Sequence, residues 1–479
     1  MSAPSGPSVA LVWLRRDLRL VDQPALHVAL TRYERVVLAF IHSDAEHGDA
    51  QPGAASRWWL HHSLAALDAR LHARGNRLII RHGPFLDALR ALSAETGATA
   101  VVWSRLYDPD SRARDARIKA ALRADGLECH SVNAALIHEP FTILTASDAP
   151  YKVFTPYYRA ARKHPVAAPR PAPEVIPAPV DIARVDSVAL AELGLRPRQP
   201  WDAEFTWTCG ESAALTRLDW FVEHALARYA ERRDQPAVDG TSRLSPHLHF
   251  GELSPRTVIA RAQGLGEAAE PFIRQLYWRD FAHVLLYHFP ETVHDPMDTR
   301  FAEYPWAHDT TASYAAWQRG ETGIPLVDAG MRQLWRTGWM HNRVRMMVAS
   351  FLTKNLRVPW QQGAAWFHDT LVDADLANNT MGWQWTAGCG ADAAPYFRVF
   401  NPIRQAERFD PAGEYIAHWI PELARLPAPA RLAPWLAGAT TLAEAGVRLG
   451  TDYPAPMVDL AQSRKAALAG YEHVKNAPR

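Results

Sequence analysis

The chain has 479 residues, of which 48% are hydrophobic and 22% charged, and its formal net charge is +1. This length predicts two or three domains, and the composition is that of an ordinary globular protein rather than a disordered or fibrous one. No apolar run approaches a membrane-spanning helix and the N-terminus lacks the pattern of a secretory signal, so we expect a cytoplasmic protein with no membrane partner. The three separated cysteines, Cys129, Cys209 and Cys389, form no CxxC pair, and we expect neither a disulfide framework nor a metal site.

The first part of the chain alternates short β-branched or apolar runs with longer segments of helical periodicity. We expect strands at 9–14, 36–41, 78–81 and 100–103, and helices at 56–74 and 110–124. Strands separated by helices predict a doubly wound parallel sheet, a Rossmann-like α/β domain that we assign to residues 1–140. Neither a G-x-G-x-x-G nor a P-loop sequence occurs there, so an ordinary dinucleotide or NTPase site is unsupported.

Residues 165–200 are rich in Pro and Ala and show little periodicity, which is typical of an extended connector. We therefore place an interdomain linker at 141–205. Beyond it the strand signals fade, and apolar residues at three-to-four spacing predict helices at 212–232, 272–289, 327–336 and 343–355. Residues 206–479 are accordingly predicted to form a larger all-α domain.

A hydroxyl-rich segment opens the helical region. Thr241 and Ser242 precede Ser245 and Pro246, and Ser before Pro is a good N-cap and first-turn pair, so a helix should begin there. Free amides at such a helix start, helped by the three hydroxyls, would hold a diphosphate. Ser254 stands before a second proline and predicts another helix start. Two ordinary helix starts without a ligand are the alternative.

A second polar cluster lies further along the chain. Asn342, Arg345 and Met346 share one face of a predicted helix, and Asp373 and Asp375 follow about thirty residues later. The spacing does not fit an EF-hand, because the sixth and twelfth loop positions are wrong. A structural ion pair between Arg345 and Asp373 is one interpretation. A pocket for a planar ligand is the other, and the Asn and Asp residues crowded beside Trp favour it.

Further motifs complete the pattern. They are Leu-Arg-Arg-Asp-Leu-Arg at 14–19, Val-Phe-Thr-Pro at 153–156, Trp-Arg-Asp-Phe at 278–281, Gly-Trp-Met-His-Asn-Arg at 338–343 and the run 392–402. Together with the two clusters they resemble the photolyase/cryptochrome family nearly end to end, and most of all the bacterial class I photolyases for cyclobutane pyrimidine dimers (CPDs). The resemblance implies an α/β antenna domain and an all-α FAD-binding domain in a monomer. It also implies that photoexcited reduced FAD transfers an electron to a flipped-out dimer in UV-damaged DNA.

The resemblance assigns the cofactor site residue by residue. In the family, FAD lies in the helical domain, and the matching positions here are Tyr229, Thr241, Ser242, Leu244, Ser245, Gln275, Asn342, Arg345, Asp373, Asp375 and Asn379. Asn379 matches the residue that faces flavin N5. A neutral amide tolerates either protonation state of N5, whereas the Asp of plant cryptochromes would stabilise the neutral radical. Asn379 therefore favours repair over signalling.

Three tryptophans match the family's electron-transfer chain between the flavin and the surface, namely Trp383, Trp360 and Trp306. Indole is oxidisable by an excited flavin, and a series of short hops is faster than one long tunnelling step. Trp306 and Trp360 each follow a proline, which predicts that both lie at helix starts.

The lesion site follows from the same resemblance, because a flavin reaches a dimer only after the dimer leaves the base stack. Trp278 and Trp385 match the aromatic walls around the flipped dimer, and Asn342 and Met346 match residues that touch it. The catalytic set is then Gln275, Trp278, Asn342, Met346, Asn379 and Trp385. DNA contacts are expected from Arg233, Trp278, Arg279, Arg343, Trp385 and Arg398. Since the net charge is near neutral, these arginines must supply a local basic patch.

The sequence departs from the CPD photolyase pattern at Gln275, where Glu is usual. Gln also occurs there in (6-4) photolyases and animal cryptochromes, so a (6-4) photolyase is one alternative. Those enzymes need a His pair at the positions of Asn342 and Met346, and the neighbouring His341 points about 100° away along a helix. CPD repair is therefore favoured. A cryptochrome-type blue-light receptor without repair is the second alternative.

A second, light-harvesting chromophore is common among such proteins. Folate-binding members carry an Asn-Glu pair where this chain has Asp110 and Ser111. This replacement weakens the acceptor for the pterin ring and disfavours folate. A deazaflavin, a flavin or no second chromophore are the remaining options.

Overall fold

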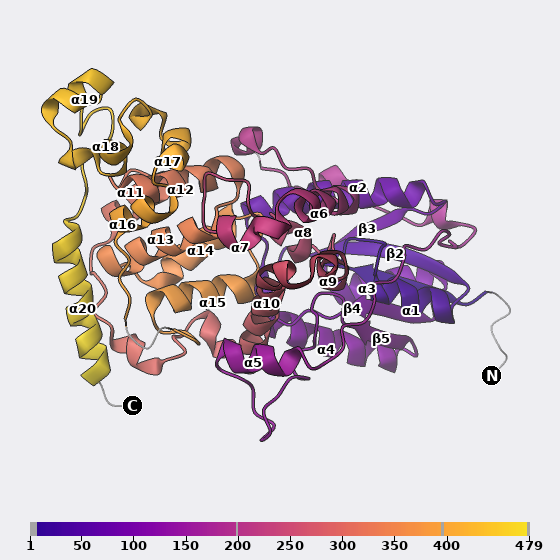
Figure 1. Cartoon of the computed structure of the whole chain (residues 1–479). Coiled ribbons are helices and arrows are strands. Elements are labelled where there is room, and N and C mark those ends of the chain that lie inside the picture. Colours follow the sequence, from indigo (N-terminus) through magenta and orange to yellow (C-terminus); the bar gives the residue numbers. More distant parts are fainter. Residues whose placement is uncertain (1–6, 198–199, 394–396, 477–479) are drawn as a thin grey trace.

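The computed structural model describes residues 7–197, 200–393 and 397–476. Figure 1 shows a sheet with flanking helices from the N-terminal part of the chain, beside a larger part made of helices. All pairings in the sheet are parallel, in the order β3-β2-β1-β4-β5. The strands are β1 (Val9–Leu14), β2 (Arg35–His42), β3 (Leu78–His82), β4 (Ala100–Ser104) and β5 (Glu128–Val132). The predicted doubly wound sheet is confirmed, and the four predicted strands lie within β1 to β4.

Strand β5 was not predicted. It forms the edge of the sheet and buries only Cys129 among its five residues. Its sequence, Glu-Cys-His-Ser-Val, is mostly polar because four of its five residues are exposed or only partly buried. Hydrophobic periodicity therefore gives no signal at this position.

Helices cover both faces of the sheet. They are α1 (Pro24–Arg32), α2 (Ala54–His72), α3 (Phe85–Thr96) and α4 (Pro109–Ala124). Helices α1 and α2 pack on the face that carries Ala10 and Val12, whereas α3 and α4 pack on the face that carries Leu11 and Trp13. Both faces are buried, which explains why the strands read as continuous apolar runs without alternation.

The connecting segment contains short structured pieces, including α5 (Phe154–Ala161). Phe154, Tyr157 and Tyr158 of α5 belong to the same buried cluster as residues of α10 (Glu270–His288) in the helical part. The connector is therefore anchored on the helical part through aromatic side chains.

The remaining chain is helical. Besides α10, its α-helices are α6 (Glu211–His224), α7 (Tyr229–Arg232), α8 (Ser245–His249), α9 (Pro255–Ala262), α11 (Thr311–Arg319), α12 (Pro325–Thr337), α13 (Asn342–Ser350), α14 (Trp360–Thr370), α15 (Leu376–Ala387), α16 (Pro402–Phe409), α17 (Glu414–Trp419), α18 (Ala428–Leu432), α19 (Ala439–Ala445) and α20 (Leu460–Asn476). The helix predicted at 212–232 is broken after His224. The helix predicted at 343–355 ends in a π-helical turn, Phe351–Asn355.

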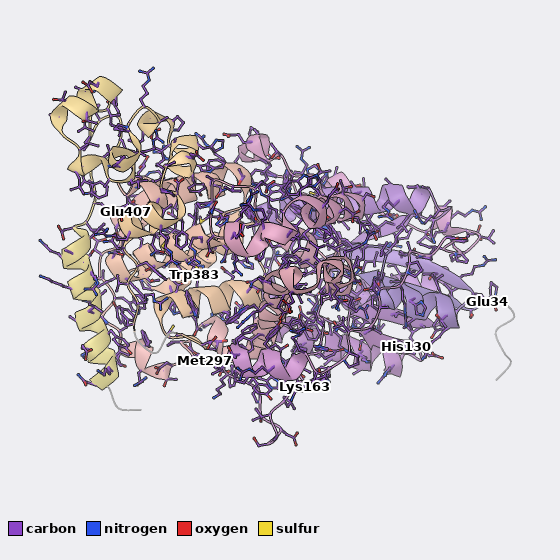
Figure 2. All side chains as sticks on the ribbon, viewed as in Figure 1. Glu34, His130, Lys163, Met297, Trp383 and Glu407 are labelled. Atoms are coloured by element: carbon purple, nitrogen blue, oxygen red, sulfur yellow. The ribbon has the colours of Figure 1, made fainter. Side chains whose placement is uncertain are left out.

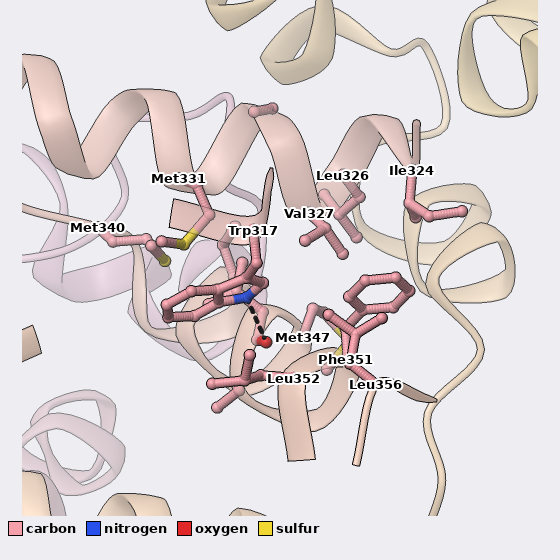
Figure 3. Packing of buried hydrophobic residues seen from close by; sticks show 14 of the residues in the cluster. Trp317, Ile324, Leu326, Val327, Met331, Met340, Met347, Phe351, Leu352 and Leu356 are labelled. Carbon is pink, nitrogen blue, oxygen red and sulfur yellow. Dashed lines mark hydrogen bonds between the residues drawn. The ribbon is translucent and has the colours of Figure 1, made fainter. Parts of the chain in front are cut away.

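The main core of the helical part is built around α12, α13 and the π-helical turn. Figure 3 shows Trp317 at its centre, with its indole N–H donating to the carbonyl of Val348 at 3.0 Å. The indole is fully buried, so this bond satisfies its one polar atom.

Within the part of the chain that the structure describes, no helix is long and apolar enough to cross a membrane.

Candidate cofactor and DNA site

An ion pair joins α13 to the segment that precedes α15, next to the first residue of α8. The Arg345 guanidinium donates to both carboxylate oxygens of Asp373, at 3.1 and 2.8 Å. The Ser245 hydroxyl donates to the same carboxylate at 2.6 Å. The ion pair between Arg345 and Asp373, one of the two interpretations of this cluster, is present. A helix does begin at Ser245, but its hydroxyl does not cap that helix, because it is bonded to Asp373.

The neighbouring Asp375 is the N-cap of α15, and one of its carboxylate oxygens accepts from the backbone N–H of Asn378 at 3.0 Å. Its other oxygen lies 3.7 Å from His249 and 3.5 Å from His283. Burial opposes ionisation of Asp375, but these two imidazoles outweigh it and hold its pKa well below the usual range. Burial lowers the pKa of His249 to about 4. Asp375 is therefore a buried, fixed negative charge.

The two helices that carry these residues each present a partly uncovered polar face. On α13, Asn342 is exposed and Arg345 and Met346 are half-buried, at the spacing that the sequence predicted. On α15, Gly382 is exposed although most of the helix is buried, and a side chain added there would meet nothing within 4 Å. Trp385 follows on the same face of α15. The open space over Gly382 suits a flat ligand laid on the helix.

The hydroxyl-rich loop before α8 is held in place by Arg217, which sequence reasoning missed. Its guanidinium donates to the carbonyls of Ser242 and Thr241, both at 2.9 Å. Leu244 and Tyr229 are buried beneath this region. The Thr241 and Ser242 side chains are half-buried and so remain reachable by a ligand. Ser254, the second predicted cap, accepts from the Arg256 amide at 3.1 Å and begins α9 as expected.

A polar network joins three predicted residues across α7, α10 and α13. Arg233 donates to the side-chain oxygen of Gln275 at 3.4 Å, and Gln275 donates to the Pro271 carbonyl at 3.0 Å. Asp234 lies 3.9 Å from Arg233 and 2.8 Å from Arg343. Asp234 therefore holds Arg343, whereas Arg233 is bonded to Gln275. No motif pointed to Asp234, because it only follows Arg233 in an ordinary charged run.

The two predicted aromatic walls are linked by residues that were not predicted. Trp278 stacks on Phe154, with centroids 3.6 Å apart and planes 10° from parallel. Trp385 donates from its indole to the carbonyl of Asp392 at 3.1 Å. The Asp392 carboxylate in turn accepts from the Phe154 amide, although burial raises the pKa of Asp392. One chain of contacts thus fixes both indoles. Residues 394–396 of the motif at 392–402 lie outside the described residues.

An arginine groove of about 390 Å³ opens beside this region. Its lining is Arg343, Arg398, Val399, Phe400, Asn401, Arg404, Gln405, Arg408 and Phe409. Arg398 and Phe400 also line the hollow that contains Trp385, so the groove leads toward that indole. The four arginines of this lining supply the local basic patch that the small net charge required.

Two nearby residues lie apart from this groove. Arg279 donates to the carbonyls of Ala135 and Leu248, at 2.6 and 3.3 Å, and lines a different hollow with Asp375. His341 is buried as the N-cap of α13, where its ring nitrogen accepts from the Arg343 amide at 3.2 Å. Burial lowers the pKa of His341 to about 4. It is therefore a neutral capping residue that does not share the face of Asn342 and Met346.

Two of the three predicted electron-transfer tryptophans are buried and the third is half-buried. Trp383 (labelled in Figure 2) and Trp360 are each 2% exposed, whereas Trp306 is half-buried. Trp360 begins α14 as predicted, and Trp383 lies against Gly363 on that helix, where an added Cβ would come within 2.1 Å of the indole. Trp306 lies in a coil segment between Glu303 and Thr311, so its predicted place at a helix start is wrong.

A further hollow lies between the sheet domain and the helical part. It is lined by Arg15, Arg16, Phe40, Ile41, His42, His47, Ala50, Pro52, Ser56, Leu60, Phe85, Leu106, Arg114, His249, Phe250, His368 and Ala374. Cationic and aromatic side chains suit an aromatic anion, but the free volume of about 50 Å³ is well below the few hundred that small-molecule sites have. The hollow as it stands therefore assigns no second chromophore.

Comparisons with known proteins agree with this architecture. Residues 10–176 match the model "DNA photolyase", and residues 272–473 match "FAD binding domain of DNA photolyase". A deoxyribodipyrimidine photo-lyase of Agrobacterium fabrum is 45% identical over 99% of both chains. Cryptochrome-2 of Arabidopsis thaliana is 37% identical, covering 98% of this chain and 79% of the relative. The crystal structure of a class III photolyase from Agrobacterium tumefaciens is 44% identical over all of both chains, with a TM-score of 0.95.

The chain belongs to the photolyase/cryptochrome family, and it contains that family's FAD-binding domain. The expected likeness to class I is not confirmed, since the similar solved structure is of a class III photolyase. The site fits FAD on its own geometry. It combines an uncovered helix face over Gly382, reachable hydroxyls at Thr241 and Ser242, and the partly buried ion pair of Arg345 and Asp373.

Proposed function

We propose that the protein repairs cyclobutane pyrimidine dimers in DNA in a light-dependent reaction. The observation that carries the proposal is the hollow around Trp385, which shares Arg398 and Phe400 with the arginine groove. Trp385 lies on the helix face that Gly382 leaves open. A site for a flat cofactor, an aromatic wall and a phosphate-binding surface are therefore adjacent, as an enzyme acting on a flipped base requires.

We infer that FAD is held by the residues expected from the sequence. Thr241 and Ser242 would contact its phosphates, and the Arg345–Asp373 pair and Asn379 would border its ring. The Asn379 amide is oriented by its donation to the Ala364 carbonyl at 2.9 Å. When bound and reduced, FAD supplies the photoexcited electron donor. The protein's own contribution is to fix the polar groups around it and to keep Asp375 ionised.

The lesion would lie between Trp278 and Trp385, with Asn342 and Met346 beneath it. Phe154 and Asp392 keep the two indoles in place, so the aromatic walls need little rearrangement on binding. Arg233, Arg343 and Arg398 would bind the flanking phosphates. Asp234 positions Arg343, and Gln275 positions Arg233.

A cryptochrome-type receptor is the second candidate, favoured by the identity to Arabidopsis cryptochrome-2. The neutral amide at Asn379 and the phosphate-binding surface favour repair instead. A (6-4) photolyase is less well supported, because Asn342 and Met346 cannot transfer protons and His341 is buried as a cap. We further propose a monomer acting in the cytoplasm, with an antenna domain at 1–140, a linker at 141–205 and a catalytic domain at 206–479.

A pair of substitutions separates the two proposed roles of the tryptophans. Trp383→Phe should abolish light-driven reduction of oxidised FAD, while chemically reduced enzyme should still repair CPDs. Trp278→Ala should leave photoreduction intact and weaken CPD binding by about tenfold or more, since stacking contributes ~1–3 kcal/mol per base. Flavin absorbance measures the first effect and a binding titration with a CPD oligonucleotide measures the second. Loss of repair by reduced Trp383→Phe enzyme would contradict the assignment.

A further inference from the structure

Three potential metal ligands meet at the carboxyl ends of β2 and β3. His42 and His82 are the last residues of these strands and are partners in the parallel register. Their rings lie 5.5 Å apart and 25° from parallel. Asp44, two residues beyond His42, places one carboxylate oxygen 3.3 Å from His42 Nε2 and the other 2.8 Å from His82 Nε2. Residues forty positions apart are thus brought together by the sheet.

The geometry points to a binding site for a divalent transition-metal ion of the zinc type, formed by His42, Asp44 and His82. Their ligand atoms lie within 4.8 Å of one another, and this is the one such group in the described ranges 7–197, 200–393 and 397–476. A tetrahedral zinc ion with N and O ligands at ~2.0–2.1 Å separates those ligands by roughly 3.3 Å. The observed separations need only small side-chain shifts, and three protein ligands leave a fourth position for water.

The loop that carries Asp44 is fixed before any ion binds. The Glu46 carboxylate accepts from the Ser43 hydroxyl at 3.3 Å and from the Phe85 amide at 2.7 Å. This ties the loop to the start of α3 and occupies the carboxylate that could otherwise compete as a ligand. Because the ligand positions are largely preset, binding requires little ordering of the chain.

A second, buried imidazole distinguishes this group from an ordinary exposed pair of one histidine and one carboxylate. His294 and Asp49 form such a pair at 2.8 Å, and both side chains are well exposed. His42, in contrast, is 3% exposed, and its Nδ1 is buried with no partner among the described residues. A metal at Nε2 would place the ring proton on Nδ1, a nitrogen that has no acceptor among the described residues.

The site also has a structural consequence. An ion held by His42, Asp44 and His82 would join the ends of two strands to the loop between them, beside the hollow that His42 lines. Since the unfolded chain does not hold these ligands together, the ion should stabilise the folded state. Cysteine spacing gave no hint of such a site, because none of its ligands is a cysteine.

The test is a zinc titration of the FAD-containing protein by isothermal calorimetry, with the bound metal counted after dialysis. We expect one zinc ion per chain and a rise in the unfolding temperature. His82→Ala and Asp44→Asn, both at exposed positions, should each weaken zinc binding at least tenfold, because even outer partners of a metal ligand change affinity by about 10–100-fold. His294→Ala, the matched substitution in an ordinary His–Asp pair, should change nothing. Flavin absorbance and circular dichroism should be the same in all variants.

A second measurement needs no substitution. Electron paramagnetic resonance of the protein loaded with one Cu²⁺ per chain should show coupling to two imidazole nitrogens. The proposal is overturned if the wild-type protein binds no zinc, or if His82→Ala and Asp44→Asn bind zinc as tightly as wild type. A copper spectrum without two imidazole ligands would overturn it equally. None of these results depends on whether the protein repairs DNA.

Discussion

Gln275 is the residue at which this chain departs most clearly from the expected CPD repair site. It lies half-buried on α10, accepting from Arg233 at 3.4 Å and donating to Pro271 at 3.0 Å. The amide is therefore built into the protein as both donor and acceptor. A carboxylate at this position would keep the contact with Arg233 and lose the donation to Pro271.

We expect Gln275→Glu to raise the repair yield for CPDs, because a charged acceptor binds the damaged bases more strongly than an amide does. The measurement is the number of dimers repaired per absorbed photon with pre-reduced enzyme. Gln462→Glu adds the same charge on exposed α20 and serves as the control. An unchanged or lower yield for Gln275→Glu would show that the pocket is built around the amide.

Asp280, also on α10, is a buried acidic residue whose ionisation affects the stability of the fold. One carboxylate oxygen accepts from the His138 amide at 2.9 Å, and the other is buried without a partner among the described residues. Burial raises the pKa of Asp280 from 3.8 to about 7. The folded state therefore keeps a proton that the unfolded state releases, and stability falls as the pH rises from about 4 to about 7.

Asp280→Asn should remove this pH dependence, because the amide is neutral throughout and still accepts from His138. The wild type should lose up to about 4 kcal/mol relative to the variant across that window, at ~1.4 kcal/mol per pKa unit. Urea unfolding of both proteins between about pH 4 and about pH 8 measures the difference. Parallel stability curves for the two proteins would show that Asp280 is ionised in the folded state or nearly unperturbed.

At the scale of elements, α14 and α15 carry two glycines with opposite surroundings. An added Cβ at Gly363 would collide with Trp383, at 2.1 Å, whereas one at Gly382 would meet nothing. The sequence alone does not distinguish them, since each is an isolated glycine in a helical pattern. The structure assigns Gly363 to helix packing and Gly382 to the proposed flavin face.

Gly382→Ala should therefore stabilise α15 by about 0.5–1 kcal/mol in the protein without FAD, since alanine is the better helix former. It should also weaken FAD binding, because the new methyl group enters the space left for the ring. Gly363→Ala should destabilise the fold by ~1–3 kcal/mol through overpacking against Trp383. Thermal unfolding and flavin titration measure both effects. Unchanged FAD binding by Gly382→Ala would remove this helix face from the proposed site.

Sequence patterns predicted the elements well where burial is continuous. The strands from Val9 to Ser104 follow from continuous apolar runs, and the helix face shared by Asn342 and Arg345 follows from helical periodicity. Strand β5 was missed because its residues are mostly polar and only Cys129 is buried. The helix start expected at Trp306 was wrong because a proline does not by itself begin a helix. Contacts between distant segments, such as Asp234 with Arg343, depend on tertiary packing that local periodicity does not encode.

At the scale of the whole molecule, the distribution of charge matters more than its sum. A net charge of +1 would attract DNA weakly, yet four arginines line one groove that leads toward Trp385. The family resemblance named two of those arginines, Arg343 and Arg398. Arg404 and Arg408 were found only in the structure, since they join the groove through the placement of α16. We therefore expect DNA to approach the proposed repair site along this groove.

The measurement that tests the central claim most directly is repair of UV-irradiated oligothymidine by the chemically reduced protein. Absorbance near 260 nm recovers when the dimers are split, so it is followed under blue light and in darkness. We expect the wild-type protein with bound FAD to restore this absorbance in the light and not in darkness. No recovery in the light, from protein whose FAD is bound and photoreducible, would contradict CPD repair and favour a cryptochrome-type receptor.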